Sequence, residues 1–173
     1  MNSVLFCHCL IGLPGAGKTT FAQEWAKKNC NLDIICPDDI RDQLYGDPVI
    51  QGDWQAVQKE IKQQFQAALQ QGHSVIYDAT NIRRAWRTDL VQSMTHENLR
   101  WIAWQMVTPV KTCLERNQGR DRQVPIDVII DFAQILNQEP PSKSEGFEAI
   151  YDVPLDEQQQ VNWEKMRSLQ DSL

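Results

Sequence analysis

The fold is decided by residues 3–19, which read SVLFCHCLIGLPGAGKT. Residues 3–11 form a nearly unbroken apolar run, and such a run ending at glycine is typical of a buried parallel strand. Residues 12–19 match the pattern G-x-x-x-x-G-K-[ST] at every fixed position. Apolar residues then recur at helical spacing, at Phe21, Ala22, Trp25 and Ala26. The sequence therefore predicts a strand, a phosphate-binding loop and a helix in the order that this motif requires.

The chemistry expected of this loop follows from its residue types. Its glycines let successive backbone N–H groups turn toward phosphate oxygens, and the following helix adds positive potential. The Lys18 ammonium is expected to reach the β- and γ-phosphates of ATP, and the Thr19 hydroxyl to ligate Mg²⁺. A chance glycine-rich turn is the alternative, and the flanking strand and helix argue against it. The predicted nucleotide contacts are Gly12, Pro14, Gly15, Ala16, Gly17, Lys18, Thr19, Thr20 and Arg116.

The rest of the chain alternates short apolar runs with amphipathic stripes. Further strands are expected at residues 33–36, 74–77, 99–107 and 149–153. Two helices are predicted from apolar stripes. The first is long and carries Trp54, Val57, Ile61, Phe65 and Leu69, and the second carries Trp86, Leu90 and Met94. Strands that alternate with helices predict right-handed βαβ units and a parallel sheet covered on both faces. The predicted fold class is therefore α/β.

Prolines mark the start of two later helices. Thr108-Pro109 is expected to open one, with its proline at the first helical position. Val124-Pro125 is expected to open the next, whose predicted core face is Ile126, Ile129, Ala133 and Leu136. Pro140 to Gly146 is interpreted as a loop, and a polar helix is expected from about Asp156.

Composition limits the classes to which the chain can belong. Of its 173 residues, 42% are hydrophobic and 23% are charged, which indicates one globular domain. The net charge is −6, but residues 83–122 hold eight Lys or Arg against four Asp or Glu, which leaves −10 elsewhere. A long, non-specific nucleic-acid binder would present a broad basic surface, so this class is disfavoured. A small cationic site for a phosphorylated ligand remains compatible with these charges.

The five cysteines form no CxxC pair and are odd in number, which is typical of reduced, mostly buried thiols. Cys7, His8 and Cys9 look like a metal cluster, but in a strand His8 points to the face opposite the two cysteines. Core packing is therefore the favoured interpretation. The early apolar run lacks a basic segment, so neither a secretion signal nor a membrane span is expected. A soluble, cytoplasmic protein is predicted.

Acidic motifs follow two of the predicted strands, where a parallel sheet presents its carboxyl ends to a ligand. After the strand at 33–36, Asp38 is expected to accept the proton of an attacking hydroxyl, and Arg41 to hold an anionic group of the acceptor. The alternative is that Asp38 or Asp39 merely caps the helix expected at residues 40–45.

The second acidic motif is Asp78-Ala79-Thr80-Asn81, after the strand at 74–77. Asp78 is expected to hold Mg²⁺ through water or to orient Arg41, while Thr80 and Asn81 contact the acceptor or a phosphate. The alternative is an Asx turn that leads into the next helix. Three arginines of that helix can be interpreted as a solvated face, namely Arg83, Arg84 and Arg87.

Three more arginines, Arg116, Arg120 and Arg122, lie around Gly119 at the end of a predicted helix. Arginines on a flexible segment can close over a transferred phosphoryl group, whereas surface charge is the alternative for any one of them. Other classes of P-loop protein lack support, because no guanine-reading NKxD element or ABC signature occurs and no second acid follows Asp78. The size and layout favour a small kinase.

Four motifs, GLPGAGKTT, PDDIR, DATN and RNQGRDRQVPIDVI, resemble the kinase domain of phage polynucleotide kinase and the P-loop kinases grouped with it. The resemblance spans about residues 12–132. It implies transfer of the ATP γ-phosphate to a 5′-hydroxyl of DNA or RNA, with Arg41 gripping the neighbouring 3′-phosphate. The residues that it implies in catalysis are Lys18, Thr19, Asp38, Arg41 and Arg120.

Together these observations predict a single P-loop kinase domain over residues 1–173, with a family-like core at about 1–137 and a C-terminal loop, strand and helix at 138–173. The expected fold is a three-layer α/β/α P-loop NTPase with a doubly wound parallel sheet in the order 2-3-1-4-5. ATP and Mg²⁺ are the expected cofactors. A short nucleic-acid end is the favoured acceptor, and a hydroxyl of a sugar, nucleotide sugar or antibiotic is the alternative. A non-catalytic ATP-binding switch is disfavoured because it would need none of Asp38, Arg41 and Arg120.

Overall fold

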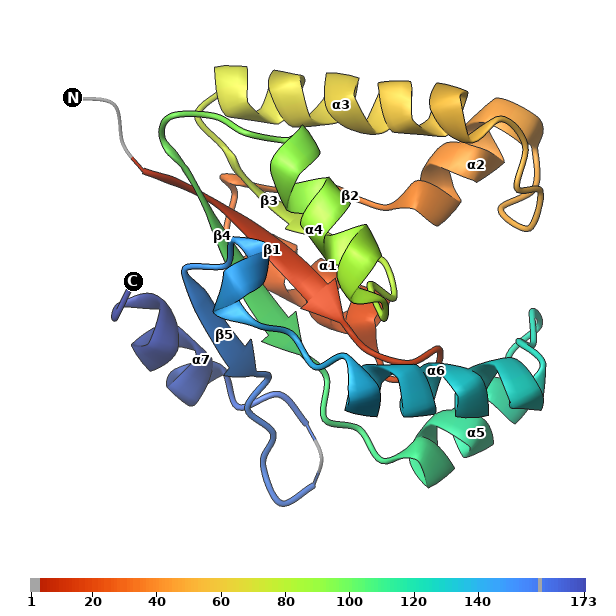
Figure 1. The fold of residues 1–173 in the computed structure, drawn as a ribbon. Helices are drawn as coiled ribbons and strands as arrows, with labels where there is room; N and C mark the ends of the chain where they lie inside the picture. Colours follow the sequence, from red (N-terminus) through yellow and green to blue (C-terminus); the bar gives the residue numbers. More distant parts are fainter. Residues whose placement is uncertain (1–3, 159) are drawn as a thin grey trace.

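Five parallel strands form the centre of the protein in a computed structural model that describes residues 4–158 and 160–173 (Figure 1). The strands are β1 (Leu5–Ile11), β2 (Leu32–Ile35), β3 (Ser74–Tyr77), β4 (Leu99–Gln105) and β5 (Ala149–Asp152). Their order across the sheet is β2-β3-β1-β4-β5, which confirms the predicted topology and the α/β class. The observed strands begin and end within two residues of their predicted bounds. Ser3, predicted to begin the first strand, lies outside the described residues.

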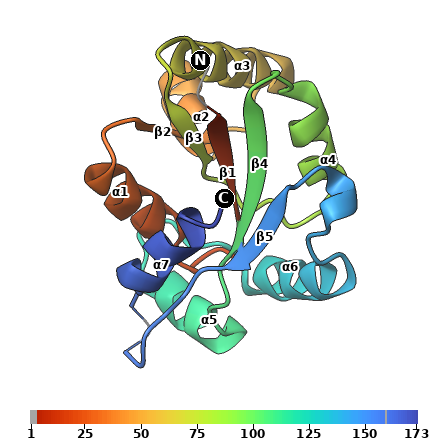
Figure 2. The same cartoon turned by 90° about the vertical axis from the view of Figure 1, so that its left-hand side faces the viewer.

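Helices cover both faces of this sheet, as the predicted three-layer fold requires. They are α1 (Lys18–Lys28), α2 (Pro37–Tyr45), α3 (Trp54–Gln70), α4 (Arg84–Ser93), α5 (Val110–Gln118), α6 (Ile126–Gln138) and α7 (Trp163–Gln170), with a 3-10 helix η1 at Lys143–Glu145. Figure 2 shows α1 and α7 on one side of the sheet and α4 and α6 on the other. None of the described helices is long and apolar enough to cross a membrane.

Two tryptophans of β4 anchor helices to opposite faces of the sheet. The Trp104 ring centroid lies 5.4 Å from that of Trp25 in α1, whereas the Trp101 centroid lies 5.8 Å from that of Phe65 in α3. All four side chains are buried. Aromatic pairs at these separations contribute to stability beyond the area that they bury. Strand β4 therefore contributes buried side chains to both faces of the sheet, one against α1 and one against α3.

The core on the α1 side is built around His8. Its ring centroid lies 4.4 Å from that of Trp25, and its Nδ1 accepts a hydrogen bond from Trp104 Nε1 at 3.1 Å. Burial lowers the pKa of His8 to about 3, so the imidazole is neutral. Cys7 and Cys9 are fully buried, and all five cysteines are free thiols. Cys7, His8 and Cys9 are all buried, so the interpretation that residues 7–9 belong to the core is confirmed.

Three helix starts differ from their predictions, and the first is that of α2, which begins at Pro37 instead of residue 40. Pro109 is the N-cap residue of α5 instead of its first helical residue. The last helix begins at Trp163, well after Asp156, because the Asp156 carboxylate accepts the N–H groups of Gln158 and Gln160 and folds this segment into a turn. Gln159, which lies within the predicted helix, is outside the described residues.

Candidate active site

The phosphate-binding loop connects β1 to α1, and its geometry requires glycine at Gly15. This residue has a φ of 82°, and a Cβ there would lie 2.5 Å from the carbonyl oxygen of Cys113. Lys18 is buried, and its ammonium donates to the carbonyls of Gly12 and Leu13, both at 2.9 Å. Burial lowers the pKa of Lys18 to about 8. The lysine is therefore held over the loop that the motif assigns to phosphates.

The two predicted Mg²⁺ ligands, Thr19 and Asp78, are in direct contact. The Thr19 hydroxyl donates to a carboxylate oxygen of Asp78 at 2.7 Å. Asp78 is buried, and burial raises its pKa, while the Thr19 hydrogen bond and the Lys18 charge oppose that rise. Hydroxyl and carboxylate oxygens are hard donors that suit Mg²⁺. The chemistry of this pair fits a magnesium ion beside the loop.

Asp38 lies in the first turn of α2 and faces two arginines. Cys36 is the N-cap residue of this helix, so the alternative that Asp38 or Asp39 caps it is wrong. One Asp38 oxygen accepts a hydrogen bond from Arg41 at 2.7 Å, and the other lies 3.5 Å from a nitrogen of Arg122. Asp38 lines the same cavity as the phosphate-binding loop, and Asp39 is not part of that lining. Asp38 is therefore the member of this pair that faces the cavity.

Arg41 is held between Asp38 and Trp54. Its guanidinium carbon lies 5.9 Å from the centre of the Trp54 ring, within range of a cation–π interaction. Its Nε is buried and has no hydrogen-bond partner in the described part of the chain. The idea that Asp78 orients Arg41 is not supported, because the observed ion pair of Arg41 is with Asp38, three residues earlier on the same helix.

The loop after β3 is attached to the end of β1. Asn81 has a φ of 47°, and its side-chain amide donates to the Leu10 carbonyl at 2.7 Å. The Gly12 N–H donates to the Thr80 carbonyl at 3.1 Å. Thr80 and Asn81 both line the cavity. The Asn81 amide nitrogen is already bonded to Leu10. The contact with an acceptor that the sequence predicts would therefore have to use the side-chain oxygen of Asn81 or the Thr80 side chain.

The three arginines of residues 116–122 all line the cavity. Arg116 reaches the phosphate-binding loop, since a Cβ on Gly17 would lie 3.6 Å from its guanidinium. The turn is closed by Asn117, whose buried side chain accepts the N–H of Val124 at 2.9 Å and donates to the Val124 carbonyl at 2.8 Å. Sequence reasoning assigned Asn117 no role. Its one signal was an uncharged amide within a segment rich in arginine.

These groups share one cavity of about 1000 Å³. Its walls also carry Trp54 and Trp86, which are 48% and 47% exposed although both lie on the predicted apolar stripes of their helices. A stripe identifies the apolar face of a helix, but it does not show which residues of that face are covered by other elements. Trp54 and Trp86 are left uncovered, and they give the cavity aromatic walls.

Helix α6 divides its apolar residues between the core and the cavity. Ile129 and Leu136 are buried as predicted, whereas Ile126, predicted to be buried, is 52% exposed. Val128 and Phe132 line the cavity. The predicted core face of this helix is therefore wrong at Ile126, and Val128 and Phe132 form a second apolar side that the prediction did not include.

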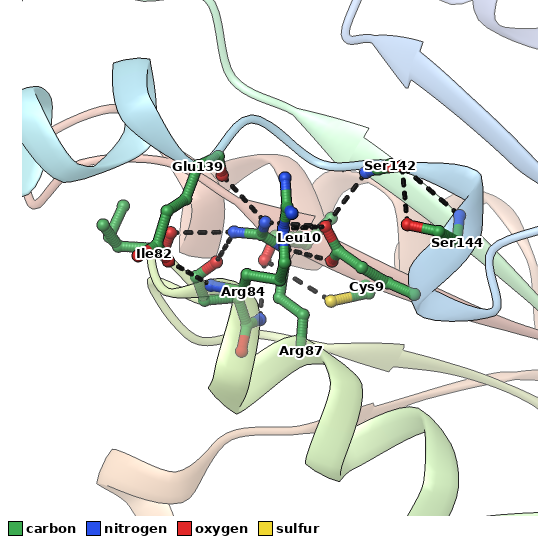
Figure 3. Close-up of polar contacts among 10 residues, drawn as sticks. Cys9, Leu10, Ile82, Arg84, Arg87, Glu139, Ser142 and Ser144 are labelled. Carbon is green, nitrogen blue, oxygen red and sulfur yellow. Dashed lines mark hydrogen bonds and ion pairs between the residues drawn. The ribbon is translucent and has the colours of Figure 1, made fainter.

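The prediction of a solvated face for Arg83, Arg84 and Arg87 is wrong for Arg87. Its side chain is fully buried, whereas Arg83 and Arg84 are exposed. Arg87 Nε donates to Glu145 Oε2 at 2.6 Å (Figure 3). Glu145 belongs to η1, inside the segment expected to be a loop. The sequence could not show this pairing, because the two residues are 58 positions apart.

A family model described as AAA domain matches residues 8–139. The L-seryl-tRNA(Sec) kinase of Methanococcus maripaludis is 30% identical to this chain over 125 residues, which is 69% of the chain and 48% of that protein. The chain therefore spans about half the length of this curated relative.

Solved structures share the fold. A chain of the Pnkp1/Rnl/Hen1 RNA repair complex superposes with a TM-score of 0.72 at 24% identity, covering 86% of this chain and 48% of that one. A putative kinase from Chloroflexus aurantiacus superposes with a TM-score of 0.68 at 18% identity, covering 99% of this chain and 100% of that one. At these identities the likeness shows the fold alone.

Proposed function

We propose that the chain transfers the γ-phosphate of ATP to the 5′-hydroxyl of a polynucleotide. The chain belongs to the AAA domain family of small P-loop kinases, and this membership supports the proposed phosphoryl transfer. The observation that carries this proposal is the position of Asp38. Its carboxylate shares a cavity with the phosphate-binding loop and lies between Arg41 and Arg122. A nucleotide-binding switch would need no carboxylate at this place.

In the proposed reaction Asp38 takes the proton of the acceptor hydroxyl while the hydroxyl oxygen attacks the γ-phosphorus. The bond from that phosphorus to the bridging oxygen breaks, and ADP leaves with the electron pair. Lys18, Arg116 and Arg120 stabilise the charge on the phosphate oxygens during transfer. Thr19 and Asp78 would hold Mg²⁺, which when bound supplies further positive charge to those oxygens.

Two features of the cavity favour a nucleic-acid end as the acceptor. Arg41 and Arg122 flank the proposed base, where they can bind a phosphate next to the reacting sugar. Trp54 and Trp86 offer half-exposed rings on which a base can stack. The net charge of −10 outside residues 83–122 would repel a long polyanion, so the expected footprint is short.

A small-molecule hydroxyl is the second candidate, and the overall charge of −6 favours it. A third acceptor is suggested by the name of the relative from Methanococcus maripaludis, which is a kinase of L-seryl-tRNA(Sec). All three acceptors present an alcohol to the γ-phosphate, so Asp38 would have the same role for each. They differ in whether a phosphate and a base accompany the hydroxyl.

The test is transfer from labelled ATP to matched acceptors: a 5′-hydroxyl dinucleotide with a 3′-phosphate, its abasic analogue, the nucleoside, a seryl-RNA and a sugar. The intact dinucleotide should exceed the nucleoside by at least about tenfold, since a hydrogen bond to a charged group contributes about 1.5–3 kcal/mol. Arg41→Ala should remove most of that preference. The matched control is Arg100→Ala, because Arg100 pairs with Glu148 and does not line the cavity. Equal rates on nucleoside and dinucleotide, or transfer only to the sugar, would reject the polynucleotide assignment.

A further inference from the structure

We infer that Arg87 is a positioning residue, which fixes the acceptor loop at residues 79–82 against the strand that leads into the phosphate-binding loop. It touches neither the nucleotide loop nor the proposed base, and it does not line the cavity. The effect of Arg87 on turnover rests on the proposed kinase function, whereas its effect on the position of the acceptor loop is independent of that function.

All five N–H donors of Arg87 are used within the protein (Figure 3). Nε donates to Glu145 Oε2 at 2.6 Å, and Nη2 donates to Glu145 Oε1 at 2.9 Å. Nη1 donates to the carbonyls of Asn81 and Ile82, at 3.1 and 2.7 Å. Nη2 also donates to the carbonyl of Glu139 at 2.8 Å. The planar fork thus joins three separate segments of the chain.

Glu145 is itself held in place. One of its oxygens accepts the N–H of Ser142 at 3.0 Å in a capping box, and Arg84 lies 3.6 Å away. Its side chain is 1% exposed. The carboxylate is therefore held by contacts other than those with Arg87, and these contacts help to set the position of the guanidinium.

Stability alone does not explain such a pair. Replacing a buried ion pair by apolar side chains of similar volume is often neutral or stabilising, because both charges must be desolvated. A fully buried arginine is therefore expected to serve a purpose that apolar packing cannot. Here the purpose is directional, because only donors can hold carbonyl groups in a given orientation.

The carbonyls that Arg87 holds belong to the acceptor loop. Asn81 adopts a φ of 47°, in the left-handed region that asparagine enters more readily than other non-glycine residues, and Arg87 holds its carbonyl in that conformation. Its side chain donates to Leu10, and the neighbouring Thr80 carbonyl accepts the Gly12 N–H. Arg87 is thus two hydrogen bonds from the start of the phosphate-binding loop. It fixes the spacing between that loop and the acceptor loop.

The same guanidinium reaches the end of α6. Glu139 is the C-cap residue of this helix, and its carboxylate also accepts the N–H of Arg84 at the start of α4, at 2.8 Å. Helix α6 follows the segment that carries Arg116, Arg120 and Arg122. Arg87 therefore connects the acceptor loop with the element that follows those arginines.

The test compares Arg87→Lys with Arg84→Lys. The first keeps a charge beside Glu145 but loses the fork, and the second changes a half-exposed arginine near the same glutamate. Hydrogen–deuterium exchange of the Gly12 amide, which reports on the Thr80 carbonyl, should accelerate about tenfold in Arg87→Lys and not in Arg84→Lys. With a 5′-hydroxyl dinucleotide, kcat should fall about tenfold in Arg87→Lys, while the ATP Kd stays within threefold of wild type. The exchange result stands even if no acceptor is phosphorylated, so the two proposals fail separately.

Unchanged exchange at Gly12 in a folded Arg87→Lys variant would overturn the inference. A proportional loss of kcat, ATP affinity and folded fraction would also overturn it, because a purely structural role predicts that pattern. If Arg87→Lys does not fold, the apolar pair Arg87→Met with Glu145→Leu replaces it. That pair should fold and show the same loss of kcat. Full turnover in the folded pair would show that Arg87 does not position the loop, and failure of the pair to fold would assign the cluster to stability alone.

Discussion

Replacing Asp38 by asparagine separates the chemical role of this residue from its structural one. The amide has the same shape and can still accept the Arg41 hydrogen bond, but it cannot take a proton from an alcohol. The Asp38 side chain is 53% exposed, so its ion pair with Arg41 contributes at most about 1 kcal/mol to stability. For a chain of this length that corresponds to a Tm shift of about 2–4 °C or less. Loss of a general base costs about 10² to 10⁴ in kcat, or about 3–5 kcal/mol.

The expected result of Asp38→Asn is therefore a large loss of rate in a protein of nearly normal stability and ATP affinity. The rate is measured as single-turnover transfer from labelled ATP at saturating acceptor. Equilibrium titration measures the ATP Kd, and calorimetry measures the Tm. Asp39→Asn is the matched control, because it lies in the same helical turn but outside the cavity lining. A kcat above about a tenth of wild type, or a larger loss in Asp39→Asn, would refute the assignment of the base to Asp38.

Three further predictions test other parts of the structure. Arg120→Lys should damage kcat nearly as much as Arg120→Ala, because one ammonium cannot reproduce the planar fork; an effect confined to the ATP KM would place Arg120 on ground-state phosphates instead. Gly15→Ala should weaken ATP binding in titrations by at least about tenfold, whereas Gly72→Ala, with a similar φ of 73° and nothing within 4 Å of its Cβ, should leave it unchanged. The folded-state pKa of His8, about 3, lies below its ordinary value of 6.5, so the unfolded chain takes up the proton first and stability falls as the pH drops below about 6.5. Between pH 6.5 and 4.5, urea titrations should show wild type losing about 2 kcal/mol more than His8→Phe, and equal losses would contradict a buried neutral imidazole.

The features that the sequence predicted are those written in local patterns. Strand and helix positions follow from apolar periodicity and a fixed-spacing motif, both contained within short windows, and the strand order follows from the fold that the motif resemblance implies. The pairing of Asp38 with Arg122 joins residues 84 positions apart, and the burial of Arg87 depends on a glutamate in η1. Such contacts arise only after the layers are assembled. The exposure of Trp54 could not be predicted either, because its apolar stripe does not show which residues other elements will cover.

Five of the six tryptophans fall into two optically distinct groups, and the half-buried Trp163 belongs to neither. Trp25, Trp101 and Trp104 are at most 5% exposed and surround the sheet, so their emission should change only when the core opens. Trp54 and Trp86 are nearly half exposed on the walls of the cavity, where a soluble quencher can reach them and an incoming base would shield them. Titration in the presence of acrylamide can therefore follow acceptor occupancy in the unlabelled protein. The unquenched blue-shifted emission of the core reports, in the same cuvette, whether the protein has stayed folded.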